Sequence, residues 1–216
     1  MPTNGSDDFN RADGGLGANW TVQASTFTGA IVSNRVRSSG GSVEMQFTAI
    51  TPGNDQSARI LIPTYTGPAD SDIGVILRAQ TPGSRSFYAF TAGAGASPGS
   101  AIYQRNAGSY TALITEGTTA WASGDGLEGR AVGNVLSLYR YAGNLDPATL
   151  ILTYTDTSTG GNALFLSGGV GIRLGLGTAG TAGQNELDNF AAGTYPAPAV
   201  GVVAQAMVGY ARRRRP

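Results

Sequence analysis

The sequence contains no cysteine and no histidine, and all 14 of its basic residues are arginines, so lysine is absent as well. Without cysteine there is no disulfide framework. Without cysteine and histidine, the chain lacks the usual zinc ligands, the usual general base and the thiol nucleophile. Charged residues make up only 13% of the chain, about half the usual share. Mechanisms that depend on a histidine or a thiolate, and zinc sites built from those ligands, are therefore excluded.

Long apolar runs and targeting segments are also missing. No stretch reaches the roughly 18 apolar residues of a membrane span, and the opening MPTNGSDDF lacks the positive and apolar regions of a signal peptide. The formal net charge is zero, but Arg212 to Arg215 place four positive charges at one end. The body is therefore mildly acidic. We expect no membrane contact, no secretion signal and no nucleic-acid partner.

Glycine is abundant, at 33 of 216 residues, and hydrophobic residues make up 41% of the chain. Apolar residues alternate with polar ones at period 2, as in SVEMQFT, where Val43, Met45 and Phe47 share one face. Turn-forming clusters separate about a dozen such runs, and no long helical period precedes residue 197. The clearest runs cover residues 43–47, 58–62, 73–79, 86–91, 101–106, 110–115, 134–142, 148–155, 170–176 and 186–192.

This pattern predicts an all-β protein, a two-sheet antiparallel jelly-roll sandwich with an extended C-terminal tail. The prolines after Thr194 mark a change in composition. We therefore expect a jelly-roll domain over residues 1–193, followed at 194–216 by a linker and an apolar, arginine-rich anchoring tail.

The opening stretch DDFNRADGGLGANW, residues 7–20, resembles the first strand of concanavalin A-like and laminin-G-like jelly rolls. In those domains an Asp-aromatic strand near the end pairs with the first strand, and LDNF at residues 187–190 fits it. The resemblance implies that Phe9 and Trp20 are buried and that the two ends of the domain close the fold. It covers roughly residues 7–193 and says more about fold than about function.

The amino-acid sequence also resembles that of virion proteins of tailed phages. That resemblance implies a non-enzymatic structural protein, a head decoration or tail component made in the host cytoplasm and present in the virion. Its partners would be other virion proteins or copies of itself, and a cell-surface glycan could be a ligand. We keep two alternatives open: a free carbohydrate-binding lectin module, and a jelly-roll glycosidase.

A glycan site would combine an exposed aromatic ring with polar side chains. Trp121 lies in TTAWASGDG, outside any apolar periodicity, so two interpretations stay open: an exposed ring that could bind a sugar, and a ring that covers a core edge. Tyr103 and Tyr110 flank a predicted hairpin tip near Arg105, although tyrosines are also common in half-buried strands. These four residues are the candidate glycan ligands.

No cofactor is expected, but a structural calcium ion is a candidate. Asp7, Asp8 and Asp188 would come together if the first and last strands pair, and calcium prefers several oxygen ligands. The alternative is that these acids cap turns and pair with arginine.

Paired carboxylates are the usual signal of a glycosidase. Asp70 and Asp72 follow Gly-Pro-Ala, which predicts a loop, and Asp125 and Glu128 lie in a predicted glycine-rich turn. The third pair, Glu186 and Asp188, has strand spacing but belongs to the predicted closing strand. We therefore name no catalytic residue.

The tail AVGVVAQAMVGY carries no charge before its four arginines. An apolar segment rimmed by arginine suits docking on a protein partner, whereas a solvated tail is the alternative. The candidate docking residues are Val202, Val203, Met207, Val208, Tyr210, Arg212, Arg213, Arg214 and Arg215.

Overall fold

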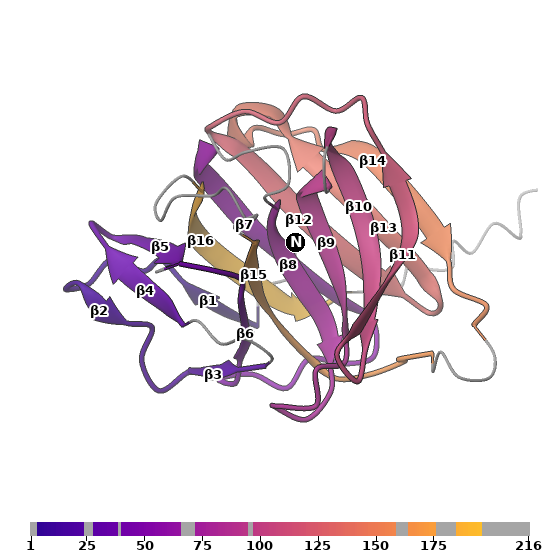
Figure 1. Ribbon diagram of the computed structural model, residues 1–216, viewed down its shortest axis with the longest axis horizontal. Coiled ribbons are helices and arrows are strands. Elements are labelled where there is room, and N and C mark those ends of the chain that lie inside the picture. Colours follow the sequence, from indigo (N-terminus) through magenta and orange to yellow (C-terminus); the bar gives the residue numbers. More distant parts are fainter. Residues whose placement is uncertain are drawn as a thin grey trace, which may run out of the picture.

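The computed structural model describes residues 4–23, 28–38, 40–65, 72–94, 97–158, 164–175 and 185–195. It forms two antiparallel sheets stacked as layers (Figure 1). This confirms the predicted all-β, two-sheet sandwich. Among the described residues, no helix has the length and apolar character needed to cross a membrane. The tail docking residues 202–215 lie outside the described part of the chain.

The larger, nine-stranded sheet has the order β14-β13-β12-β7-β16-β5-β4-β2, with β1 paired to β16. Its strands are β1 (Gly5–Asp7), β2 (Gly14–Gly15), β4 (Gly29–Val32), β5 (Arg35–Ser38), β7 (Gln56–Tyr65), β12 (Asp125–Val132), β13 (Val135–Tyr141), β14 (Thr149–Thr155) and β16 (Asn185–Thr194). A 3₁₀ turn, Ala142–Asn144, follows β13.

The seven-stranded sheet has the order β11-β10-β9-β8-β15-β6-β3. Its strands are β3 (Trp20–Val22), β6 (Val43–Phe47), β8 (Asp72–Ala79), β9 (Phe87–Ala94), β10 (Ser97–Asn106), β11 (Ser109–Glu116) and β15 (Gly169–Gly175). Most of them were predicted in outline from period-2 runs or turn signals. The sequence placed Asp72 and residues 92–99 in loops, whereas Asp72 begins β8, β9 extends to Ala94 and β10 begins at Ser97.

The core between the sheets follows the predicted alternation. Val43, Met45 and Phe47 of β6 are buried in it. Val170, Ile172 and Leu174 of β15 join them, while Gly171 and Arg173 occupy the alternate positions. Because successive side chains of a strand point to opposite faces, Glu44, Gln46 and Arg173 are directed to the outer face of the seven-stranded sheet.

The two ends of the domain close the fold, as the resemblance implied. Strand β1 pairs with β16, with Gly5 opposite Ala192 and Asp7 opposite Phe190, so the opening and closing segments lie side by side (Figure 1). Phe9 and Trp20 are buried, and the ring centroids of Trp20 and Phe190 are 5.0 Å apart.

Trp121 is not the exposed ring that its role as a candidate glycan ligand requires. Its residue exposure is 8%, it belongs to the core, and its indole Nε1 donates a hydrogen bond to Ser100 Oγ at 2.9 Å. The other interpretation, that the Trp121 ring covers an edge of the core, is correct. A buried indole needs a partner for its N–H, and Ser100 supplies one.

The prediction of a glycine-rich turn over residues 125–128 was also wrong. Asp125 and Glu128 lie in β12, between β7 and β13. Gly126 and Gly129 suggested a turn, but both sit where a side chain would collide with a neighbour. A Cβ at Gly129 would lie 2.7 Å from the ring of Phe90, so this glycine marks close packing within a strand.

Candidate functional site

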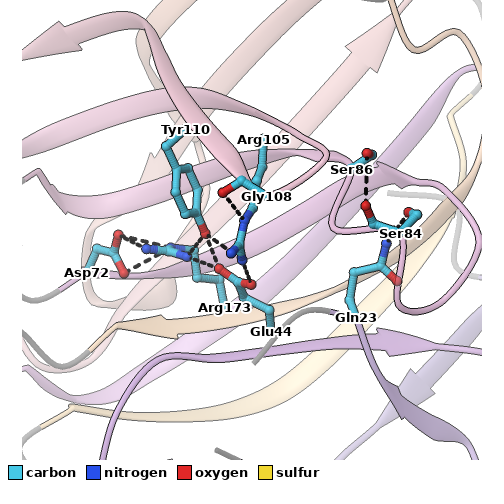
Figure 2. Close-up of polar contacts among 9 residues, drawn as sticks. All are labelled: Gln23, Glu44, Asp72, Ser84, Ser86, Arg105, Gly108, Tyr110 and Arg173. Atoms are coloured by element: carbon cyan, nitrogen blue, oxygen red, sulfur yellow. Dashed lines mark hydrogen bonds and ion pairs between the residues drawn. The ribbon is translucent and has the colours of Figure 1, made fainter. Parts of the chain in front are cut away.

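The outer face of the seven-stranded sheet carries a set of charged and phenolic side chains that contact one another. We call it the polar cluster. It consists of Glu44 on β6, Asp72 on β8, Arg105 on β10, Tyr110 on β11 and Arg173 on β15 (Figure 2).

Arg173 is the centre of the polar cluster. It stands opposite Glu44 in the register of β15 and β6 and forms an ion pair with it. On its other side it binds Asp72, with Nε 3.0 Å from Oδ1 and Nη2 2.8 Å from Oδ2. Burial alone would lower the pKa of Arg173, but the charges of Asp72 and Glu44 and the nearby Tyr110 outweigh it and raise that pKa. The guanidinium is therefore held charged between two carboxylates.

Arg105 and Tyr110 reach the same carboxylate from the opposite edge of the sheet. Arg105 is ion-paired with Glu44, and the Tyr110 hydroxyl donates a hydrogen bond to Glu44. Strands β10, β9, β8 and β15 lie between β11 and β6 in the sheet. At about 4.8 Å per strand, a flat sheet would separate β11 from β6 by roughly 24 Å. The sheet must therefore curve strongly around this outer face.

Tyr110 presents both an aromatic face and a fixed hydroxyl. The residue is 41% exposed, and the guanidinium carbons of Arg105 and Arg173 lie 4.6 and 4.9 Å from its ring centroid. Burial of the hydroxyl raises the pKa of Tyr110 despite the opposing effect of Arg173, and Glu44 raises it further. The phenol is therefore neutral and remains a hydrogen-bond donor.

The floor beside the polar cluster is apolar and tightly packed. Ile76, Phe87 and Ala89 form a second buried cluster, separate from the main core, and Tyr103 packs against it. Two neighbouring positions admit only glycine. A Cβ at Gly74 would lie 1.8 Å from the carbonyl oxygen of Phe90, and one at Gly171 would lie 2.0 Å from that of Met45.

Loop contacts fix the rim of this face (Figure 2). The Ser86 hydroxyl accepts a hydrogen bond from the Ala107 amide at 3.0 Å, and Arg105 Nε donates to the Gly108 carbonyl at 3.2 Å. Gln23, beyond β3, reaches Ser84 Oγ at 3.3 Å. The tip of the β10–β11 hairpin is thereby attached to the β8–β9 connection, which also contacts the segment after β3.

Of the four predicted glycan residues, the structure brings together Tyr103, Arg105 and Tyr110 on this face. Trp121 is not part of it. Glu44 and Arg173 were not among the predicted site residues, and Asp72 was considered only as a loop carboxylate next to Asp70. The alternation of residues 43–47 and 170–176 did place Glu44 and Arg173 away from the core, but an outward-facing charge on a strand is ordinary and does not indicate a site.

The candidate calcium ligands lie near one another. Burial raises the pKa of Asp188, and the nearby charges of Asp8 and Asp7 raise it further. Asp7, however, is already engaged. Its Oδ1 accepts hydrogen bonds from Arg11 Nη1 at 2.6 Å and the Phe9 amide at 2.9 Å, and its Oδ2 accepts one from Trp20 Nε1 at 2.8 Å. No group of three or more acidic residues that could hold a metal ion occurs in the part of the chain that the structure describes.

The remaining predicted carboxylates are ion-paired as well. Asp125 contacts Arg140 at 2.8 Å, and Glu128 contacts Arg130 at 2.9 Å. Glu186 contacts Arg35 at 2.6 Å and also pairs with Arg37. These acids lie on the nine-stranded sheet, away from the polar cluster. Asp70 lies outside the described residues.

The architecture is that of the concanavalin A-like lectin and glucanase jelly rolls. The fold resembles the carbohydrate-binding module CBM66 from Bacillus subtilis, with a TM-score of 0.56 and 14% identity over 81% of this chain and 94% of that one. It also resembles a β-1,3-glucanase from Mycobacterium marinum, with a TM-score of 0.53 and 13% identity over 89% of this chain and 99% of that one.

A third similar structure is the GH43 BlXynB protein from Bacillus licheniformis, with a TM-score of 0.62 and 15% identity over 90% of this chain. The match spans only 40% of that protein. No protein-family model matches the chain, and no curated protein matches it. At these identities the similarity shows the fold alone.

Proposed function

We propose that the protein is a non-enzymatic carbohydrate-binding module and that the polar cluster is its binding site. The observation that carries this proposal is the partly exposed ring of Tyr110, held between two guanidiniums beside two fixed carboxylates. An aromatic face offers an apolar contact to a sugar ring, and rigid donors and acceptors around it can bind its hydroxyls. The likeness to the module CBM66 supports this choice among functions.

Binding is a better proposal than hydrolysis. A glycosidase normally needs one carboxylic acid that keeps its proton until it protonates the leaving group. In the polar cluster, Glu44 and Asp72 both contact the guanidinium of Arg173. Both carboxylates are therefore already occupied as partners of one arginine side chain. The likeness to a β-1,3-glucanase therefore supports a shared fold more than a shared activity.

The virion role expected from the sequence has less support. It rested on the resemblance of the sequence to phage virion proteins, on the absence of catalytic residues and of a secretion signal, and on the tail beyond residue 196, which lies outside the described residues. None of the three structures named above is described as a phage protein. The virion assignment and the docking of the tail stay predictions.

A glycan array probed with the purified protein tests the proposal. We expect binding to at least one saccharide, weakened about tenfold or more by Tyr110→Ala because the ring contact is lost. Tyr139→Ala, on the nine-stranded sheet, is the matched control and should bind as the wild type does. A folded wild type that binds no glycan, or a Tyr110→Ala variant that binds normally, contradicts the proposal.

A further inference from the structure

The formal charges of the polar cluster cancel. Glu44 and Asp72 contribute two negative charges, and Arg105 and Arg173 contribute two positive ones. Tyr110 is neutral because the pKa of its hydroxyl is raised. An incoming anion would therefore meet guanidiniums that are already paired, next to two carboxylates that repel it.

Other described charges near this face do not alter the balance. Arg78, although on β8, directs its guanidinium to the carbonyls of Asn54, Phe165 and Gly133. The remaining ionised residues of the seven-stranded sheet and of its β8–β9 connection are Glu116 at the end of β11 and Arg85. Their charges also cancel. Among the described residues of this sheet and its β8–β9 connection, there is therefore no excess charge of either sign to attract an ionic ligand over distance.

Glu44 supplies the negative charge that balances the two arginines at the centre of the polar cluster. One of its oxygens pairs with Arg105, while the other pairs with Arg173 and accepts a hydrogen bond from Tyr110. The side chain is only 1% exposed, so solvent screens these contacts weakly. Removing the charge of Glu44 alone would leave two guanidiniums against the single carboxylate of Asp72.

A second observation on the same face points to a ligand that donates hydrogen bonds. Gln46 follows Glu44 on the outer face of β6, and its Oε1 is buried with no hydrogen-bond partner among the described residues. A buried carbonyl oxygen without a hydrogen-bond partner is destabilising. A hydroxyl can donate to this oxygen, as it can to the carboxylates of the polar cluster, whereas an ionised carboxylate or sulfate cannot.

We propose that the polar cluster selects an uncharged, hydroxyl-rich saccharide and that Glu44 is the specificity-determining residue that excludes anionic saccharides. This inference rests on the proposed carbohydrate-binding function. Hydroxyl groups would donate to Asp72 and Gln46 and accept from the two arginines, while the buried Glu44 would act through its charge. Uronate and sulfated saccharides would be rejected, because they add negative charge beside two carboxylates and bring fewer donors.

Isothermal titration with neutral hexose and pentose oligosaccharides, and with uronate oligosaccharides of matched length, tests the inference. We expect the wild type to bind a neutral ligand, with an affinity that changes less than about twofold between low salt and about 0.5 M NaCl because no net charge is involved. Glu44→Gln should raise the affinity for the uronate ligand by about tenfold relative to the neutral one. The control is Asp146→Asn, which removes the charge of an exposed residue next to the nine-stranded sheet. It should leave both affinities unchanged.

The outcomes separate the two proposals. If the wild type binds neither class, the carbohydrate-binding function is wrong, and this inference is wrong with it. If it prefers the uronate ligand, with an affinity that falls steeply with salt, binding stands and the selection for uncharged ligands is wrong. If folded Glu44→Gln gains no affinity for uronate, the role of Glu44 is wrong. Should Glu44→Gln fail to fold, Asp72→Asn removes the same charge, and the salt series on the wild type decides independently.

Discussion

Three aromatic residues show how a single side chain is assigned to core or surface. Trp20 and Trp121 are both buried, and each indole N–H has a partner, Asp7 for Trp20 and Ser100 for Trp121. Tyr110 also has a satisfied hydroxyl, but its ring is partly exposed on edge strand β11. The polar partner therefore does not distinguish the three residues. The face on which each ring lies does: Trp20 and Trp121 belong to the core between the sheets, whereas Tyr110 lies on the outer face.

At this scale we predict that Trp121→Ala lowers the free energy of unfolding by about 3–5 kcal/mol, because it removes a large buried side chain. Urea unfolding followed by circular dichroism measures the change. Leu145→Ala, at a residue that is 70% exposed, should shift stability by less than about 0.5 kcal/mol. If Trp121→Ala keeps wild-type stability but loses glycan binding, the indole is a ligand contact and its buried placement is wrong.

At the scale of strands, β8 and β15 form the floor that the polar cluster surrounds. Each has a glycine on its outer face, Gly74 and Gly171, where a Cβ would meet the carbonyl of the neighbouring strand. Glycine inside a strand usually weakens it, and here it permits close backbone approach. The same strands place Ile73, Val75 and Leu174 in the core. One pair of strands thus supplies both the core and the curved outer face.

Gly74→Ala should destabilise the fold by about 1–3 kcal/mol or more, since its Cβ would lie 1.8 Å from backbone that cannot move aside easily. Thermal unfolding compares it with Gly15→Ala, where nothing lies within 4 Å of the added Cβ. The control should unfold near the wild-type temperature. Equal unfolding temperatures for the two variants would show that β8 tolerates a side chain at this position.

At the scale of the whole molecule, Arg78 connects the two sheets. It is fully buried on β8, and its guanidinium donates to the carbonyls of Asn54, Gly133 and Phe165 at 3.0, 2.6 and 3.0 Å. Gly133 lies in the β12–β13 turn of the nine-stranded sheet, and Asn54 lies just before β7 in the connection between the two sheets. Burial lowers the pKa of Arg78, although the charges of Asp55 and Asp156 partly oppose this. The planar guanidinium reaches acceptors in several directions at once, which an ammonium cannot do.

Arg78→Lys should therefore cost at least about 2 kcal/mol of unfolding free energy, because buried carbonyls lose their donors. The exposed Arg85→Lys is the matched control and should be close to neutral. Guanidinium-induced unfolding of both variants gives the comparison. A neutral Arg78→Lys would mean that the carbonyls find other donors and that Arg78 does not hold the sheets together.

The sequence by itself determined the fold class, most strand positions and the faces of individual strands. The alternation in residues 43–47 and 170–176 separated Val43 and Leu174 from Glu44 and Arg173, because side-chain direction has a period of two residues along any strand. The likeness of the opening stretch to a known family, together with LDNF, placed the first strand beside the last. These features depend on neighbours in the chain or on a recognisable segment, so they are readable without coordinates.

Only the tertiary structure decided which outward residues meet. Glu44 and Tyr110 are separated by 66 positions in the chain and by four strands in the sheet, and they touch because the sheet curves. Curvature results from strand order, bulges and close glycine contacts acting together, and no local pattern encodes it. The same reason explains why the sequence left the placement of Trp121 open. Its segment lacks periodicity, and its burial depends on contact with Ser100, on a strand that precedes it by a full hairpin.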